Sequence, residues 1–182
     1  EIGDDNHFRE FVTVNRGTLP GTKTVIGSHN HFLAYSHIAH DCVVGNHCVF
    51  SNNGTLAGHV TVEDHVIIGG LTAVHQFCRI GPLAMVGGQA HVTKDVPPYV
   101  TIDGLSSLVV GLNQIGLQRH GHSEEQIKSL RAAFKTLYRS KLNIAQALEA
   151  LRAGSPCEDV RHLIEFVASS QRGITPAGRE QE

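Results

Sequence analysis

Apolar side chains recur at every sixth residue over the first half of the chain. The series runs Ile2, Phe8, Val14, Pro20, Ile26, Phe32, Ile38, Val44, Phe50, Leu56, Val62, Ile68, Val74, Ile80, Val86 and Val92. Pro20 alone breaks it, inside a segment rich in Gly, Thr and Pro (residues 17–24) that we expect to form a loop. A period of six fits neither an α-helix nor simple strand alternation, and it is typical of a parallel β-helix. We call the residues of this series the anchors.

Three hexads should make one triangular coil, so that residue i lies beneath residue i+18. Successive coils then stack at about 4.8 Å, the spacing between paired strands. Resemblance to known hexapeptide-repeat proteins implies that the solenoid is left-handed. Gly or Ala follows many anchors, and we expect glycine there to supply the backbone angles of a tight corner.

The pattern changes after the coils. Residues 95–99 contain Pro97 and Pro98, which should end the sheet because proline donates no ladder hydrogen bond. We therefore predict a β-helix over residues 1–102 and a C-terminal α-helical domain over 103–182. In this domain we expect helices at 108–119 and 143–153. Two further helices should begin at capping boxes, one at 123–126 and one at 155–158. A polar tail from about residue 174 should be frayed.

Composition narrows the possible functions. The 182 residues carry a net charge of −2, which argues against a nucleic-acid-binding protein. No apolar run is long enough to cross a bilayer, so no stable membrane insertion is expected. Cys42, Cys48 and Cys78 each fall four residues after an anchor, a position that holds small residues elsewhere, and we interpret them as small hydrophobic groups. Reduced thiols fit a cytoplasmic protein. The chain begins inside a repeat, and we expect the natural product to carry further N-terminal coils.

Thirteen histidines are many for this length, and coil arithmetic gathers some of them. Gly58 should lie above His40, and Gln76 above Gly58. The neighbours of these three in sequence bring His37, Asp41, His59 and His75 to the same face. The other solenoid histidines show no comparable cluster in this arithmetic: His7, His29, His31, His47, His65 and His91.

Three interpretations of the histidine cluster remain open from the residues alone. The side chains are unrelated solvated groups, or they bind a metal ion as in the γ-class carbonic anhydrases, or His40 is a general base. In the third case Asp41 would orient the His40 ring. The backbone N–H of Gly58 would then stabilise an oxyanion.

Four runs of sequence resemble the UDP-N-acetylglucosamine O-acyltransferase family. They span residues 36–42, 52–60, 69–77 and 95–99, and the resemblance extends to about Gly173. It implies transfer of an (R)-3-hydroxyacyl chain from acyl carrier protein to the 3-hydroxyl of UDP-N-acetylglucosamine, the first step of lipid A biosynthesis. It also implies a homotrimer with active sites between subunits, no metal and no cofactor, and more N-terminal coils than this chain has.

The resemblance also implies roles for individual residues. His40 matches the general base, Asp41 the group that holds its ring, and Gly58 the oxyanion donor. Gly88 matches the position that limits acyl-chain length. The positions that match the substrate or acyl-chain cleft are His37, His59, His75, Gln76, Asn113 and Arg119.

Four basic residues at helical spacing form a candidate docking surface: Lys128, Arg131, Lys135 and Arg139. Such a stripe is by itself typical of a solvated helix face. Acyl carrier protein is acidic, so the resemblance favours docking of that partner. Two other functions remain as alternatives, a zinc-dependent protein of the γ-class carbonic anhydrase type and a catalytically inactive, truncated scaffold. Stoichiometric zinc would favour the first, and failure of an acyl-transfer assay would favour the second.

Overall fold

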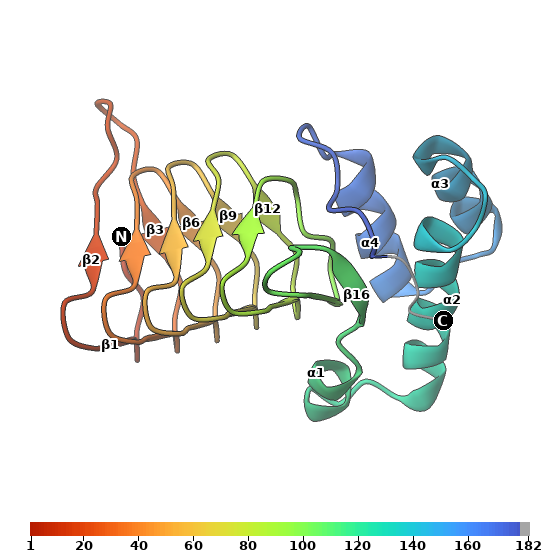
Figure 1. Cartoon of the computed structure of the whole chain (residues 1–182), viewed down its shortest axis with the longest axis horizontal. Coiled ribbons are helices and arrows are strands. Elements are labelled where there is room, and N and C mark those ends of the chain that lie inside the picture. Colours follow the sequence, from red (N-terminus) through yellow and green to blue (C-terminus); the bar gives the residue numbers. More distant parts are fainter. Residues whose placement is uncertain (179–182) are drawn as a thin grey trace.

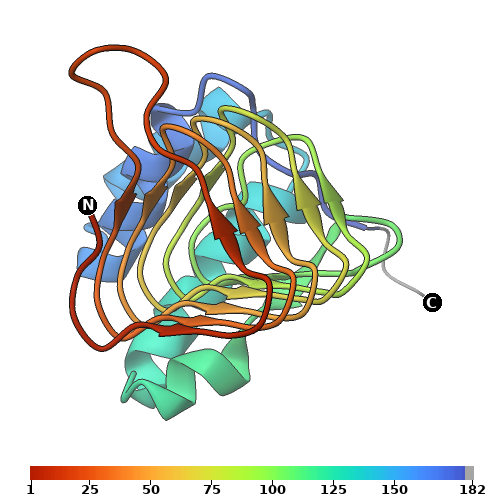
Figure 2. The same cartoon turned by 90° about the vertical axis from the view of Figure 1, so that its left-hand side faces the viewer.

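The structure, a computed structural model, describes residues 1–178 and consists of a β-solenoid followed by four helices (Figure 1). The first sheet contains β1 (His7–Phe8), β4 (His31–Phe32), β7 (Val49–Phe50), β10 (Ile67–Ile68), β13 (Met85–Val86), β15 (Val100–Ile102) and β16 (Val109–Leu112). The second contains β2 (Thr13–Val14), β5 (His37–Ile38), β8 (Thr55–Leu56), β11 (Ala73–Val74) and β14 (His91–Val92). The third contains β3 (Val25–Ile26), β6 (Val43–Val44), β9 (Thr61–Val62) and β12 (Arg79–Ile80). Figure 2 shows the three sheets as the sides of a triangle.

The predicted coil length is confirmed in the middle of the solenoid. Val25 pairs with Val43, His37 with Thr55 and Ile67 with Met85, each pair parallel and three hexads apart. Every anchor from Ile26 to Val92 is at most 2 % exposed, so the anchors form the solenoid core. The three cysteines four residues after an anchor are fully buried, as predicted. Burial raises the pKa of the Cys48 thiol to about 12, which leaves it protonated and inert.

The coil length departs from three hexads at both ends. In the first coil Ile2 pairs with Ile26 and Thr13 with His37, a separation of four hexads. In the last coil Met85 pairs with Thr101, which is two positions short of three hexads. The prediction that Pro97 and Pro98 end the sheet is wrong: the chain passes both prolines and adds β15 to the first sheet. The additional hexad enters the first coil as the loop at residues 15–24, which projects from the solenoid (Figure 2).

Glycine does not form the corners of the coils, contrary to the prediction. The left-handed backbone conformation falls on the third residue after most anchors, and residue types other than glycine occupy it, among them Asp41, His59 and Phe77 with φ of 59°, 61° and 64°. Glycine directly after an anchor instead allows close stacking of coils. A Cβ on Gly27, for example, would lie 2.6 Å from the carbonyl oxygen of Gly45 in the next coil, closer than real Cβ atoms approach.

The helical domain contains α1 (Gln114–Arg119), α2 (Glu124–Tyr138), α3 (Ile144–Ala153) and α4 (Glu158–Ala168). The capping box at Ser123 is confirmed, because its side chain accepts from the Gln126 N–H and the Gln126 side chain accepts from the Ser123 N–H. The box predicted at Ser155 is wrong, since α4 begins after Cys157 and has no side-chain cap.

Two further predictions for this region need correction. The helix expected over 108–119 is β16 followed by the short α1; β16 pairs antiparallel with β15, and its residue Val109 is fully buried. The tail is not frayed up to residue 178. Ile174 bridges to Asp95 and Ala177 to Val109, and Thr175 is buried. Residues 179–182 of that prediction lie outside the described residues.

Side chains from α4 join the helical domain to the third sheet. Nε2 of His162 lies 2.8 Å from Oε2 of Glu63, and the guanidinium of Arg79 lies 4.2 Å from the centre of the Phe166 ring. Arg79 also donates to Ser169 at 2.8 Å. In the part of the chain that the structure describes, no helix is long and apolar enough to cross a membrane.

A second group of histidines, contrary to our expectation, stacks along the corner between the third and first sheets. The His29, His47 and His65 rings follow one another at 4.9 and 4.8 Å, nearly parallel. His120 at the end of α1 extends the column, 4.4 Å from His65. The same arithmetic of three hexads could have revealed the first three. His7 and His31 also stack, but across the longer first coil.

This column predicts that acid weakens the fold. Burial, and then the neighbouring His120 and His47, lower the pKa of His65. Above about pH 6.5 the ring is neutral in both the folded and unfolded states, whereas below that pH the unfolded chain takes up the proton more readily. Stability should therefore fall as the pH drops from about 6.5 through the folded pKa. The measurement is thermal unfolding at several pH values. His65→Asn should reduce the dependence of stability on pH. His91→Asn, which changes an exposed ring without such stacking, is the control and should leave that dependence unchanged. An identical slope in the His65 variant would contradict the prediction.

Candidate active site

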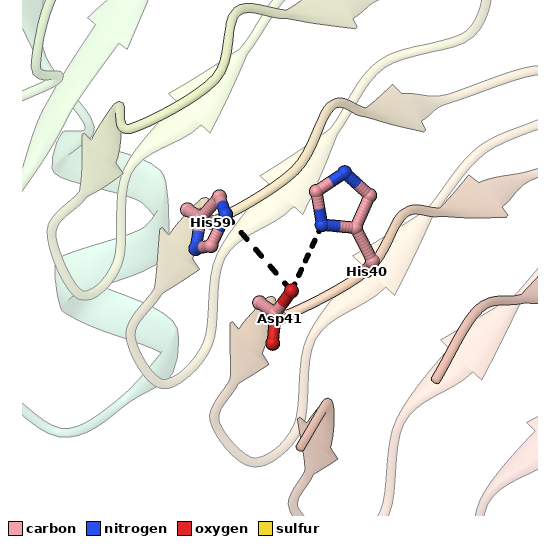
Figure 3. A group of neighbouring side chains, drawn as sticks. All are labelled: His40, Asp41 and His59. Atoms are coloured by element: carbon pink, nitrogen blue, oxygen red, sulfur yellow. Dashed lines mark hydrogen bonds and ion pairs between the residues drawn. The ribbon is translucent and has the colours of Figure 1, made fainter. Parts of the chain in front are cut away.

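The candidate site is built at the corner that follows the second sheet, where β5 ends and the chain turns into β6. His40 is the second residue after the anchor Ile38, and Asp41 is the left-handed residue at the turn. This reversal brings two adjacent side chains together. Nδ1 of His40 lies 2.9 Å from Oδ2 of Asp41 (Figure 3). The His40 side chain is 40 % exposed and that of Asp41 only 6 %, so the carboxylate lies behind the ring and the ring faces outward.

The protonation of this pair follows from the surroundings of the carboxyl group. The Thr22 hydroxyl, and then that of Thr18, lower the pKa of Asp41 well below its usual range, despite the opposing effect of burial. Asp41 is therefore ionised at neutral pH and can only accept hydrogen bonds. Nδ1 of His40 must donate to it. In the neutral ring this leaves Nε2 unprotonated and able to take a proton from a substrate.

Gly58 lies against His40 one coil further along, as coil arithmetic predicted. A Cβ built on Gly58 would lie 2.7 Å from Nε2 of His40, so no larger residue fits without moving the ring. The Gly58 backbone has a negative φ, so the absence of a side chain matters here for space. Among residues 1–178 the Gly58 N–H makes no hydrogen bond, whereas its carbonyl accepts from the Phe77 N–H. An unpaired donor beside a base is what an oxyanion site requires.

His59 completes the group. Its Nε2 lies 3.9 Å from Oδ2 of Asp41, and its ring stands edge-on to His40 at 5.2 Å. Phe77 of the next coil stacks on it at 4.8 Å and fixes its plane. Ligand atoms of His40, Asp41 and His59 lie within 4.8 Å of one another, so the three could hold a metal ion. The alternative of a metal site therefore has a geometric basis at these residues.

The other predicted cleft residues divide into two groups. His75 and Gln76 lie at the same corner in the next coil, where Nδ1 of His75 donates to the Gln76 carbonyl at 3.1 Å. His37 is on β5 and shares a hydrogen bond of 2.7 Å with the Thr13 hydroxyl. These three belong to the neighbourhood of His40.

Asn113 and Arg119 do not lie beside His40 within one chain. They belong to the corner at the far edge of the third sheet, where Asn113 donates to the Leu83 carbonyl at 2.9 Å and caps α1 by accepting from Gly116. Arg119 forms the last turn of α1. Gly88 is also separate: it is exposed at the corner between the first and second sheets, where an added Cβ would lie 3.1 Å from the Gly70 carbonyl oxygen.

The basic residues of α2 border a groove. It has a volume of about 1120 Å³, lies between β16 and α2, and includes Arg131, Lys135 and Arg139 in its wall. Lys128 is one turn earlier, in a smaller pocket that Arg131 also lines. Arg131 donates to Gln114 at 3.0 Å and Arg139 to the Gly178 carbonyl at 2.7 Å. Arg139 therefore also has a structural role.

Comparison with known proteins gives matches over nearly the whole chain. Residues 23–58 match the hexapeptide repeats of bacterial transferases, and residues 95–175 match the second domain of UDP-N-acetylglucosamine O-acyltransferase. The acyl-[acyl-carrier-protein]–UDP-N-acetylglucosamine O-acyltransferase of Anaeromyxobacter sp. (strain K) is 53 % identical over 178 residues, and that of Myxococcus xanthus 52 % over 176; each match covers 96 % of this chain and 68 % of the relative.

Solved structures agree with these matches. LpxA from Acinetobacter baumannii superposes with a TM-score of 0.90 at 41 % identity, over 96 % of this chain and 69 % of that one. The UDP-N-acetylglucosamine acyltransferase of Francisella novicida gives 0.92 at 34 %, over 98 % and 66 %. The chain thus spans about two thirds of the length of its relatives. With these identities and this shared architecture, the chain belongs to the UDP-N-acetylglucosamine O-acyltransferase family.

Proposed function

We propose that the chain transfers an (R)-3-hydroxyacyl group from acyl carrier protein to the 3-hydroxyl of UDP-N-acetylglucosamine, the first step of lipid A biosynthesis. The observation that supports this most directly is the exposed His40 ring between an ionised Asp41 and the unpaired N–H of Gly58. A general base and an oxyanion donor are the two groups that acyl transfer to a hydroxyl requires. The relatives named above carry both substrates in their names.

The reaction can be followed atom by atom at these groups. Nε2 of His40 removes the proton from the sugar hydroxyl, and the oxygen attacks the thioester carbonyl. The negative charge that develops on the carbonyl oxygen is stabilised by the Gly58 N–H. Collapse of the tetrahedral intermediate forms the ester and expels the thiolate, which takes the proton from His40. Asp41 keeps its negative charge and stabilises the imidazolium in between.

A homotrimer is part of this proposal. Asn113, Arg119 and Gly88 lie at other corners of the solenoid than His40, so a neighbouring subunit is needed if they share its cleft. Cyclic symmetry would repeat such a composite site three times.

The four cysteines are free thiols, which supports a cytoplasmic location.

The test is an acyl-transfer assay with UDP-N-acetylglucosamine and a panel of hydroxyacyl carrier proteins, with product detection by mass spectrometry. We expect a 3-O-acylated sugar nucleotide and no effect of EDTA. Inactivation by EDTA with recovery on addition of zinc would favour the metal site at His40, Asp41 and His59 instead. No product with any donor would favour an inactive scaffold.

The basic face of α2 predicts how the donor protein docks. Changing Lys128, Arg131 and Lys135 to Glu should raise the apparent KM for acyl carrier protein about tenfold at low salt and flatten its dependence on ionic strength, because the acidic partner loses its charge complement. Arg139 is left intact because it binds the Gly178 carbonyl. Arg152→Glu on α3 is the control, as an exposed basic residue outside both pockets. An unchanged KM at low salt in the triple variant would contradict this docking surface.

A further inference from the structure

The loop at residues 15–24 joins β2 to β3. It accounts for the difference between the first coil of four hexads and the middle coils of three. It leaves the solenoid at the corner that, one coil later, carries His40 and Asp41. A solenoid coil needs no such insertion, and β2 and β3 pair normally on either side of it. The loop is therefore an addition placed beside the candidate active site.

The loop contacts Asp41 through both backbone and side chain. The Thr18 hydroxyl donates to Oδ2 of Asp41 at 2.7 Å, and the Thr18 N–H donates to the same oxygen at 3.2 Å. The Asp41 N–H in turn donates to the Thr24 hydroxyl at 2.9 Å. Oδ2 is also the oxygen that meets Nδ1 of His40. One carboxylate oxygen thus links the loop to the ring.

We propose that this loop positions the His40–Asp41 pair through Thr18, whose hydroxyl and N–H both donate to Oδ2 of Asp41. By donating twice to Oδ2 of Asp41, Thr18 fixes the orientation in which that oxygen accepts from Nδ1 of His40, so that Nε2 points toward the substrate. Thr18 touches no reacting atom and acts only through Asp41. The inference rests on the proposed acyl transfer for its kinetic consequences, but its structural claim concerns the ring and the carboxylate alone.

The hydroxyl also affects the charge on the pair. The Thr18 hydroxyl shares the negative charge on Oδ2, and after Thr22 it is the next cause that lowers the pKa of Asp41. Removing the Thr18 hydroxyl leaves more of that charge directed at His40, which favours the imidazolium. The His40 pKa should then rise, and the acid limb of the rate profile should move to higher pH. His59, 3.9 Å from the same oxygen, is the other titratable group that faces it.

The experiment compares Thr18→Val with Thr18→Ser. Valine keeps the shape and the N–H but loses the hydroxyl, whereas serine keeps both donors. We expect Thr18→Val to lower kcat/KM about tenfold, chiefly in kcat, and to shift the acid limb upward. Thr18→Ser should stay within about twofold of the wild type, with an unshifted limb. Leu19→Ala, an exposed neighbour in the loop, serves as the control for a general disturbance.

A second measurement does not depend on turnover. NMR titration of the His40 ring should give a higher pKa in Thr18→Val than in the wild type and in Thr18→Ser. An unshifted His40 pKa, with wild-type kcat in Thr18→Val, would overturn the positioning role even if the enzyme is active. An inactive wild type would overturn the proposed function, while the titration would still decide whether Thr18 acts on the pair.

Discussion

Replacing His40 with alanine is expected to reduce turnover by a factor of about 10²–10⁴, the usual contribution of a positioned general base. Neither Asp41 nor His59 is placed to substitute for it. Asp41 is ionised, but it lies behind the ring with 6 % of its side chain exposed. The His59 ring stands edge-on to the His40 ring, with the ring centres 5.2 Å apart, so its nitrogens do not occupy the position of Nε2 of His40. The measurement is kcat with saturating UDP-N-acetylglucosamine and acyl donor.

The fold should survive the His40→Ala change because the ring is 40 % exposed and makes its one hydrogen bond to Asp41. Circular dichroism and size-exclusion chromatography should therefore match those of the wild type. His91→Ala, which removes an exposed imidazole of another corner, is a matched control and should retain activity. If His40→Ala keeps more than about a tenth of the wild-type rate, His40 is not the base.

Gly58→Ala should be nearly as damaging, although it adds only a methyl group. The new Cβ would meet the His40 ring closer than van der Waals contact allows, so the ring must turn away or the two coils must separate. Either movement breaks the alignment of Nε2 with the Gly58 N–H, and a displacement of about 1 Å can cost on the order of 10² in rate. The change should appear in kcat, because the Gly58 N–H is retained but is no longer aligned with Nε2 of His40.

The matched control for Gly58→Ala is Gly70→Ala, two hexads later at the same position relative to its anchor. There a Cβ would meet the Asn52 carbonyl oxygen at 3.3 Å, a contact that a small shift relieves. Normal thermal stability of both variants, with kcat lost only in Gly58→Ala, is the expected pattern. Wild-type kcat in Gly58→Ala would show that the His40 ring is not held where the structure places it.

The sequence was sufficient for the solenoid because its two main constraints are local and periodic. An anchor at every sixth position fixes which side chains enter the core, and steps of three hexads then place Gly58 above His40 and Gln76 above Gly58. The same rule failed where the chain departs from it. Thr18 is 23 residues from Asp41 in sequence, a separation that becomes a contact only because one hexad is inserted.

Other failures had different physical causes. The spacing of three between Val109 and Leu112 fits a helical stripe as well as a strand, because a strand as short as β16 does not show its period. Ser155 has a left-handed backbone and so cannot cap α4. The separation of Asn113 from His40 depends on how the first sheet turns back after β15, which no local pattern in the sequence encodes.

The antiparallel turn from β15 into β16 has a consequence for how the solenoid avoids end-to-end growth. Every earlier strand of the first sheet presents its outer backbone groups to a parallel successor, and an uncapped stack of this kind could recruit further chains. Here the last successor runs in the opposite direction, and Ala177 from the end of the chain bridges to Val109 on it. A newly arriving coil would find a strand of the wrong polarity, already occupied in part by the protein's own C-terminal segment. The reversal thus acts as a stop to fibre-like growth at this end.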